Sequence, residues 1–277
     1  MQPHQRGHQL SAARPQPVAL IRGSQPLSTA ATKLCENAGM SETRFDAHLR
    51  RHPVHFRTLL LVTAAALATA GLLAFFIDLP VATWCKAHRL PGELGRLINL
   101  LEISGHSLGA AIILLAAVTL DQSLRFPWLG RFAAGEQAFV RLVAATYLGG
   151  LVVDAIKVSV ERVRPRAADL ATLGSPFATF GDASLTVAAP HAADLMSFPS
   201  GHSAVAAGLA AALAWRYPRG IPLFAFLAAA TALQRVLTSA HYPSDVAFGA
   251  AVGLIGAAAC VGPCRSRPGS LAGCTSA

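Results

Sequence analysis

Two cations with helical spacing stand where an apolar stretch ends, in the segment KVSVERVRP. Lys157 and Arg164 are seven residues apart, close to two helical turns, so both side chains lie on one helix face. Pro165 disfavours helix at the residue before it and ends the segment. Paired cations suit an anion such as phosphate. The alternatives are a structural ion pair between Lys157 and Asp154, or boundary cations that reach toward lipid headgroups.

A second group, Pro199-Ser200-Gly201-His202, opens an alanine-rich apolar run. Pro suits the first turn of a helix and Ser caps its free N–H groups, so a helix is predicted to begin here. A helix N-terminus attracts anions, a glycine lets a ligand approach the backbone, and an imidazole can transfer protons. The segment is therefore either an anion site with a titratable group or only a helix start.

The third group is the segment QRVLTSAHYPSD, which runs from Gln234 to Asp245. His241 and Asp245 are four residues apart, so one helical turn can bring the carboxylate to the imidazole Nδ1. This contact fixes the tautomer and leaves Nε2 as a nucleophile or a base. A lone histidine at a membrane boundary is usually structural. Here, however, a carboxylate follows the histidine and Arg235 precedes it by six residues.

Together the three groups resemble the signature of the phosphatidic acid phosphatase type 2 and haloperoxidase superfamily. The shared pattern is Lys-x6-Arg-Pro, then Pro-Ser-Gly-His, then Arg-x5-His-x3-Asp, and the resemblance covers residues 57–262. One departure is Gln234, since the family often has Ser before this arginine. Gln can still donate a hydrogen bond to a phosphate oxygen, but it is longer, so substrate fit is affected more than chemistry.

The resemblance implies a mechanism and a set of site residues. His241 attacks phosphorus and forms a phosphohistidine, while Asp245 holds its ring. His202 protonates the leaving oxygen and then takes a proton from water. The phosphate is bound by three cations and by the start of a helix, which are Lys157, Arg164, Arg235, Ser200 and Gly201. The resemblance implies no metal and no other cofactor.

The composition indicates a membrane protein. The chain of 277 residues is 53% hydrophobic and 13% charged, with a mean hydropathy of +0.46, whereas soluble domains carry about 25% charged residues. The formal net charge is +9, but basic residues are scattered and only 7% of residues are aromatic. We therefore expect no nucleic-acid partner. The five cysteines contain no C-x-x-C pair, so neither a disulfide framework nor a zinc site is expected.

Six apolar stretches approach the roughly 20 residues of a membrane span, which predicts an all-α, six-helix transmembrane bundle. The predicted spans are residues 58–77, 99–120, 137–160, 201–217, 221–239 and 242–262. The second is the weakest because Glu102 and His106 occupy its first turns. These two side chains either face the pocket or form a packed polar pair. Small residues such as Gly249, Gly253 and Gly256 let neighbouring helices approach closely.

The distribution of Lys and Arg predicts the orientation of the bundle. With a cytoplasmic N-terminus, 15 of the 23 Lys and Arg residues lie on the cytoplasmic side and 6 on the other. Residues 1–56 then form a disordered basic cytoplasmic tail, 57–262 the membrane domain, and 263–277 a short cytoplasmic tail. All three motifs emerge on the non-cytoplasmic face, which is the periplasmic face if the membrane is a bacterial inner membrane.

The predicted activity is hydrolysis of a lipid phosphate monoester or diphosphate by an integral membrane phosphatase. Candidate substrates are phosphatidic acid, phosphatidylglycerol phosphate, polyprenyl diphosphate and lipid A phosphates, and membrane lipids are the expected partners. A lipid phosphotransferase would use the same residues, and a catalytically silent scaffold or transport protein would keep the bundle. Vanadate-dependent haloperoxidases share this kind of pocket but are soluble, so six apolar spans argue against them. The sequence leaves the oligomeric state open.

Overall fold

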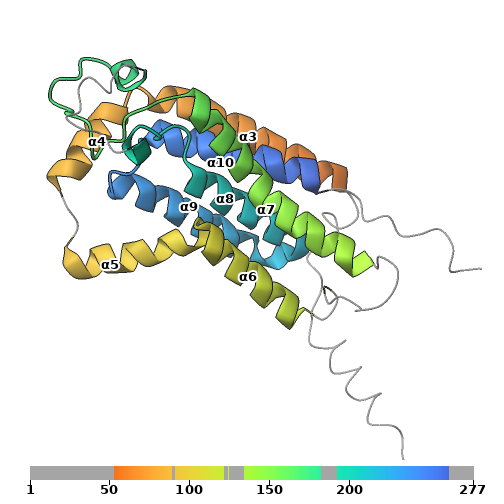
Figure 1. The fold of residues 1–277 in the computed structure, drawn as a ribbon. Coiled ribbons are helices and arrows are strands. Elements are labelled where there is room, and N and C mark those ends of the chain that lie inside the picture. Colours follow the sequence, from red (N-terminus) through yellow and green to blue (C-terminus); the bar gives the residue numbers. More distant parts are fainter. Residues whose placement is uncertain (1–52, 89–90, 122–123, 125–133, 182–191, 262–277) are drawn as a thin grey trace, which may run out of the picture. The chain divides into compact units, whose positions relative to one another are not determined.

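The computed structural model of the protein describes residues 53–88, 91–121, 124, 134–181 and 192–261, and this part of the chain is helical. β pairing within it is limited to two isolated bridges, from Arg162 to Phe180 and to Met196. The helices in Figure 1 are α3 (Pro53–Ala74), α4 (Asp78–Ala87), α5 (Gly92–Leu100), α6 (Ser107–Leu120), α7 (Ala134–Ser159), α8 (Gly201–Arg216), α9 (Ile221–Leu237) and α10 (Pro243–Cys260). The predicted all-α class is confirmed. The predicted tails lie outside the described residues, apart from 53–56, which begin α3.

The short 3-10 helices are η1 (Leu101–Ser104), η3 (Pro176–Thr179), η5 (Ala192–Asp194) and η6 (Pro218–Gly220). Within the described residues, four helices are long and apolar enough to cross a membrane, at His55–Ala74, Ala138–Ser159, Pro218–Leu237 and Pro243–Cys260. A fifth candidate is a bent pair of segments, Gly92–Ser104 and Ser107–Leu120. The predicted fourth span, α8, has 16 residues, fewer than the roughly 20 that a span needs. The chain is a polytopic helical membrane protein, but the count of six spans is not confirmed.

The predicted span 99–120 is not one straight helix. The chain bends by 64° between η1 and α6, and His106 caps the start of α6 through its Nδ1. Gly105, at the bend, lies so close to α8 and α9 that a Cβ there would be 2.6 Å from the His202 carbonyl oxygen and 2.6 Å from Cγ2 of Thr231. The close approach of three helices at this glycine is the physical reason for the break. It also brings the side chain of Glu102 to His202.

Helices α8 and α10 form the centre of the bundle. α8 packs against α7, α9 and α10, and α10 also packs against α3 and α7. Small residues make this packing close, as the sequence predicted. A Cβ on Gly249 would lie 2.3 Å from the Ser200 carbonyl oxygen, and a Cβ on Gly253 would lie 2.2 Å from the Ala204 carbonyl oxygen. The contact at Gly249 fixes the start of α8 against α10.

The segments that contain the three motifs meet at one end of the helix bundle. The Ser200 N–H donates to the Asp245 carbonyl oxygen, and the Arg166 N–H donates to the Ser239 carbonyl oxygen, both at 3.0 Å. α4 joins them because Lys86 Nζ donates to a backbone carbonyl in the segment after α7, at 2.8 Å. The end of α9 and the starts of α8 and α10 therefore surround one region, together with α4 and the segment after α7.

Candidate active site

His241 lies between α9 and α10 and is buried, with 2% of its surface exposed. Its Nδ1 is 2.7 Å from the Ser197 carbonyl oxygen. Because a carbonyl oxygen can only accept, Nδ1 carries the proton and Nε2 keeps its lone pair. Burial lowers the pKa of His241, and the nearby Arg164 and Lys157 lower it further. The imidazole therefore has the tautomer and the neutral charge that a nucleophile needs.

Asp245 lies within ion-pair distance of the His241 imidazole, as expected, but the two residues do not share one helix. His241 precedes the helix, which begins at Pro243, and Asp245 Oδ2 is 3.6 Å from Nδ1 of the imidazole. The carboxylate instead accepts hydrogen bonds from Ser197 Oγ at 2.6 Å and from the Tyr242 N–H at 2.9 Å. Asp245 therefore fixes the residue whose carbonyl orients the imidazole, and it acts on His241 mainly through Ser197.

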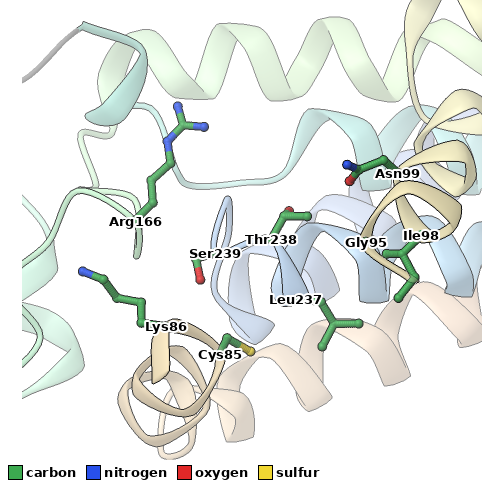
Figure 2. Close-up of a pocket in the computed structure, with 9 residues that line it drawn as sticks. All are labelled: Cys85, Lys86, Gly95, Ile98, Asn99, Arg166, Leu237, Thr238 and Ser239. Atoms are coloured by element: carbon green, nitrogen blue, oxygen red, sulfur yellow. The ribbon is translucent and has the colours of Figure 1, made fainter. Parts of the chain in front are cut away.

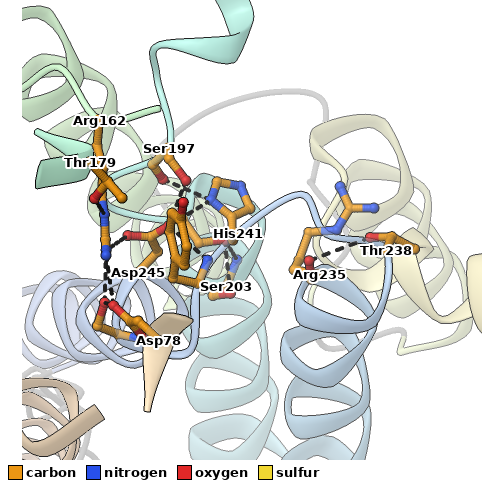
Figure 3. Close-up of polar contacts among 12 residues, drawn as sticks. Asp78, Arg162, Thr179, Ser197, Ser203, Arg235, Thr238, His241 and Asp245 are labelled. Atoms are coloured by element: carbon orange, nitrogen blue, oxygen red, sulfur yellow. Dashed lines mark hydrogen bonds and ion pairs between the residues drawn. The ribbon is translucent and has the colours of Figure 1, made fainter. Parts of the chain in front are cut away.

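A buried arginine holds this carboxylate in place (Figure 3). Arg162 is fully buried and pairs through Nη1 with Asp245. Its Nη2 pairs with Asp78 Oδ2 at 2.7 Å. The remaining donors reach Ser244 Oγ at 2.8 Å and Thr179 Oγ1 at 2.9 Å. One guanidinium thus joins α4, the segment after α7 and the start of α10.

Sequence reasoning missed this arginine and its second carboxylate. Arg162 was counted only among the six cations of the non-cytoplasmic side, and Asp78 lies 84 residues before it. The rings of Tyr242 and Phe180, which cover the guanidinium at 4.2 Å and 4.5 Å, also come from separate segments. No spacing rule links such residues. The one signal in the sequence is an acid directly after the first apolar stretch, where lipid gives it no partner.

The start of α8 brings Ser200, Gly201 and Lys157 together. Ser200 is the N-cap, and its Oγ accepts a hydrogen bond from the Ser203 N–H at 3.4 Å. A Cβ on Gly201 would lie 3.5 Å from Lys157 Nζ, so the ammonium group is beside the helix N-terminus. Among the ion pairs of the described residues there is none between Lys157 and Asp154. The alternative of a structural ion pair is therefore not supported.

Glu102 contacts two of the predicted site residues. Its Oε1 is 3.0 Å from His202 Nε2, and its Oε2 is 2.5 Å from Arg235 Nη2. The contact with His202 is an ion-pair contact without hydrogen-bond alignment, since Nε2 has no aligned partner in the described part of the chain. The ring of His106 lies 5.9 Å from that of His202, centroid to centroid. Of the two alternatives for Glu102, the pocket-facing one matches the structure.

The Gln234 side chain supports Arg235 through a hydrogen bond and does not project past the guanidinium. Its Oε1 accepts a hydrogen bond from Arg235 Nε at 2.6 Å. Its Nε2 donates to Asn99 Oδ1 at 3.2 Å and, more weakly, to Glu102 Oε2 at 3.4 Å. The side chain is almost fully buried. The departure from the family pattern therefore changes how the arginine is supported, and the amide is already committed to protein partners.

Arg164 completes the group of cations, but α7 ends at Ser159, so the prediction that Arg164 and Lys157 share one helix face is wrong. Its backbone N–H donates to the Asp194 carbonyl oxygen at 2.7 Å, while its buried Nε has no hydrogen-bond partner among the described residues. Burial lowers the pKa of Arg164, and the charges of Arg166 and Arg235 lower it further. Cations gathered in this way repel one another, and a bound anion relieves the repulsion. In the described residues no three His, Cys, Asp or Glu side chains are placed to hold a metal ion.

Comparison with known proteins identifies the family. The profile of the PAP2 superfamily matches residues 138–262, which contain all three motifs. The chain is also 34% identical over 164 residues to the decaprenylphosphoryl-5-phosphoribose phosphatase of Mycobacterium tuberculosis, a match over 59% of this chain and 76% of the relative. The chain belongs to the PAP2 superfamily. The resemblance seen in the three motifs is confirmed.

Further similarities of this PAP2 protein are also to phosphatases. It is 29% identical over 212 residues to the lipid A 1-phosphatase of Rhizobium etli, over 73% of this chain and 82% of the relative. The crystal structure of a transmembrane PAP2-type phosphatidylglycerolphosphate phosphatase from Bacillus subtilis aligns with a TM-score of 0.44 and 21% identity, over 75% of this chain and 92% of that one. The sequence relatives are named as phosphatases and the chain has helices apolar enough to cross a membrane, so the PAP2 protein is a phosphoric ester hydrolase of the membrane.

Proposed function

We propose that this PAP2 protein hydrolyses a lipid phosphate through a phosphohistidine intermediate on His241. One observation carries the proposal: Nδ1 is committed to the Ser197 carbonyl, so the lone pair of a neutral imidazole lies on Nε2. Lys157 and Arg164 are near enough to lower the pKa of His241. The nucleophile is thus beside charges that can hold a phosphate, and these side chains need no metal ion to do so.

The reaction has two steps that share one acid–base group. In the first, His241 Nε2 forms a bond to phosphorus, and the bond between phosphorus and the lipid oxygen breaks. His202 gives that oxygen a proton, so the dephosphorylated lipid leaves and the phosphoryl group stays on His241. In the second, His202 takes a proton from water, the water oxygen attacks phosphorus, and the N–P bond breaks. Phosphate leaves and both imidazoles return to their starting states.

Three side chains and one helix end supply the charge. A phosphate monoester carries about −1.5 to −2 charges at neutral pH, and Lys157, Arg164 and Arg235 together balance it. The N-terminus of α8 at Ser200 and Gly201 adds roughly 0.3–2 kcal/mol of attraction for an anion. Phosphoryl transfer depends mainly on positioning and charge stabilisation. This arrangement provides both.

The two carboxylates take different parts in this mechanism. Asp245 positions His241 through Ser197, and Glu102 positions His202 by direct contact. Glu102 also contacts Arg235, so a bound phosphate competes with this carboxylate for the guanidinium. Substrate binding therefore draws Arg235 toward phosphate and leaves Glu102 to His202.

An apolar groove supports a lipid as the substrate. The groove has a volume of about 570 Å³ and lies between α3, α8, α9 and α10, with Ser203 and Pro243 at the site end. An acyl or prenyl chain fits such a surface while the headgroup enters the site. Phosphatidic acid, phosphatidylglycerol phosphate, polyprenyl diphosphate and lipid A phosphates are the proposed candidates. The Lys and Arg distribution supports cytoplasmic termini and a periplasmic site in a bacterial inner membrane.

Phosphate release from this panel of lipids, by protein purified in detergent, tests the proposal. His241→Ala should lower turnover by at least about 10³-fold, and a chelator should not change wild-type turnover. His88→Ala, an exposed histidine on α4, is the matched control and should keep wild-type activity. Normal turnover by His241→Ala contradicts the phosphohistidine. Transfer of the phosphoryl group to an added lipid alcohol, with no phosphate released, identifies a phosphotransferase instead.

A further inference from the structure

A pocket with two cationic side chains, Lys86 and Arg166, lies between the end of α4, α5 and the end of α9 (Figure 2). Its volume is about 450 Å³, within the range of roughly 300–1,000 Å³ typical of small-molecule sites. Three segments and one single residue line it: the end of α4, the face of α5, the end of α9, and Arg166 from the segment after α7. Leu237, Thr238 and Ser239 lie within the third motif, between Arg235 and His241, and the other lining residues lie outside the three motifs.

Hydrogen bonds join this pocket to the candidate active site. Asn99, on the pocket wall, accepts from Gln234 at 3.2 Å, and Gln234 in turn accepts from Arg235 at 2.6 Å. On the other wall, the Arg166 N–H donates to the carbonyl of Ser239, which lies in the chain between Arg235 and His241. The two walls are therefore built on the same residues that hold the cation and the nucleophile.

The lining has a positive charge that the proposed reaction does not use. It includes Lys86 and Arg166 and no acidic residue. Lys86 Nζ donates to the Ala168 carbonyl oxygen at 2.8 Å, and no carboxylate pairs with it in the described part of the chain. Arg166 shares its charge with Asp194, at 2.8 Å, but remains 49% exposed. The pocket is thus a headgroup-sized space with an unbalanced cation on one wall.

We propose that this pocket binds a second phosphate group, carried by the headgroup of the same lipid whose first phosphate reacts at His241. Lys86 and Arg166 bind its oxygens through charge-assisted hydrogen bonds, and Asn99, Thr238 and Ser239 contact the polar unit between the two phosphates. The pocket then selects lipids with two phosphates over phosphatidic acid, which has one. This inference rests on the proposed function, because it extends the substrate from that site.

Two lipids with equal chains separate this idea from general electrostatics. Dioctanoyl phosphatidylglycerol phosphate has a phosphodiester and a terminal phosphate, whereas dioctanoyl phosphatidic acid has only the terminal one. Both are assayed in a neutral detergent, so that no neighbouring anionic lipid can fill the pocket. The measured quantity is the ratio of kcat/KM for the first lipid to that for the second. A parallel arm adds phosphatidylglycerol, which has the diester but no reacting phosphate.

The ratio should favour the two-phosphate lipid in the wild type and fall about tenfold in both Lys86→Gln and Arg166→Gln, since each removes one charged hydrogen bond. Lys86→Arg should restore it. Arg96→Gln, which removes a 79% exposed cation of α5 that does not line the pocket, should leave the ratio within about twofold. A ratio unchanged by both pocket variants overturns the inference. Phosphatidylglycerol should inhibit hydrolysis of the two-phosphate lipid more strongly in the wild type than in the pocket variants, and equal inhibition of all three proteins also overturns the inference.

Binding separates failure of the pocket from failure of the proposed function. In the His241→Ala background, the ratio of Kd values for the two lipids should shift about tenfold with the same pocket variants. If the wild type hydrolyses neither lipid but this shift occurs, the proposed function fails while the pocket assignment stands. If hydrolysis occurs and neither ratio responds to the pocket variants, the proposed function stands and the pocket assignment fails.

Discussion

The two histidines of the candidate site are held in different surroundings. His241 is almost fully buried, and the Arg162 and Asp245 side chains that support it are completely enclosed. The side chains of His202 and Glu102 are each 30% exposed, and Glu102 lies on η1, beside the bend before α6. A nucleophile works from one fixed geometry and suits a rigid interior. The Nε2 of His202 is itself buried, and the Glu102 carboxylate beside it offsets the cost of the charge that His202 gains when it is protonated.

Replacement of Arg162, which supports the buried surroundings of His241, should have the largest effect. Arg162→Met leaves the carboxylates of Asp78 and Asp245 buried without their cation, which costs about 3–5 kcal/mol of folding free energy. Turnover should fall as well, because Ser197 loses its fixed partner. Thermal unfolding in detergent measures the first effect and phosphate release the second. Arg96→Met, an exposed arginine on α5 paired with Glu93, should leave both unchanged. Equal stability of the two variants would contradict the assigned role.

Replacement of Glu102 should affect the partly exposed surroundings of His202 without unfolding the protein. Glu102→Gln removes the charge beside His202 and frees Arg235 for phosphate. We expect kcat to fall about tenfold or more, KM to stay level or decrease, and the unfolding temperature to change little. Glu93→Gln on the neighbouring α5 is the matched control. An increase in KM with unchanged kcat would instead assign Glu102 to substrate binding.

The pH dependence of stability gives the smallest and most local test. The pKa of His241 in the fold lies below its usual value of 6.5 because the ring is buried. Below about pH 6.5 the unfolded chain therefore binds a proton that the folded chain does not. Stability from this residue is complete above that pH and is lost as the pH falls toward the folded pKa, by up to about 1.4 kcal/mol per pH unit.

Unfolding temperatures of the wild type and of His241→Asn between pH 7.5 and pH 5.5 measure this effect. The wild type should lose more stability than the variant over this range. Parallel curves would mean that His241 takes up protons in the fold as easily as in the unfolded chain, which would remove the argument for a neutral nucleophile.

The comparison also shows where sequence reasoning succeeded. Residue types and motif order identified the family, which was confirmed, whereas the roles of His241, His202 and the three cations stay predictions. The contact of Glu102 with the site was one of two stated alternatives. The count of six spans was not confirmed because the second apolar stretch is bent by 64° and α8 has only 16 residues.

Other contacts in the site could not be predicted from the local spacing of residues in the sequence. The carbonyl that orients His241 comes from 44 residues away, and Asp78 bonds to the Ser244 N–H across 166 residues. A main-chain carbonyl has no side chain to signal its role, and an acid at the end of an apolar stretch gives no clue to its partner. The Lys86 and Arg166 pocket is also assembled from separate segments.

The sequence by itself determined the family of this protein and the residue types of its candidate site: helices apolar enough for a membrane, three cations, two imidazoles, and helix ends that predict a common face. Tertiary structure alone decided which groups hold His241, how Arg162 joins two carboxylates, and that Lys86 and Arg166 line a pocket together with Asn99 and Ser239. The physical reason is the sequence distance over which each kind of interaction acts. Helical periodicity relates residues only one or two turns apart, whereas a buried charge takes whichever partner the packing of distant segments brings within hydrogen-bond distance.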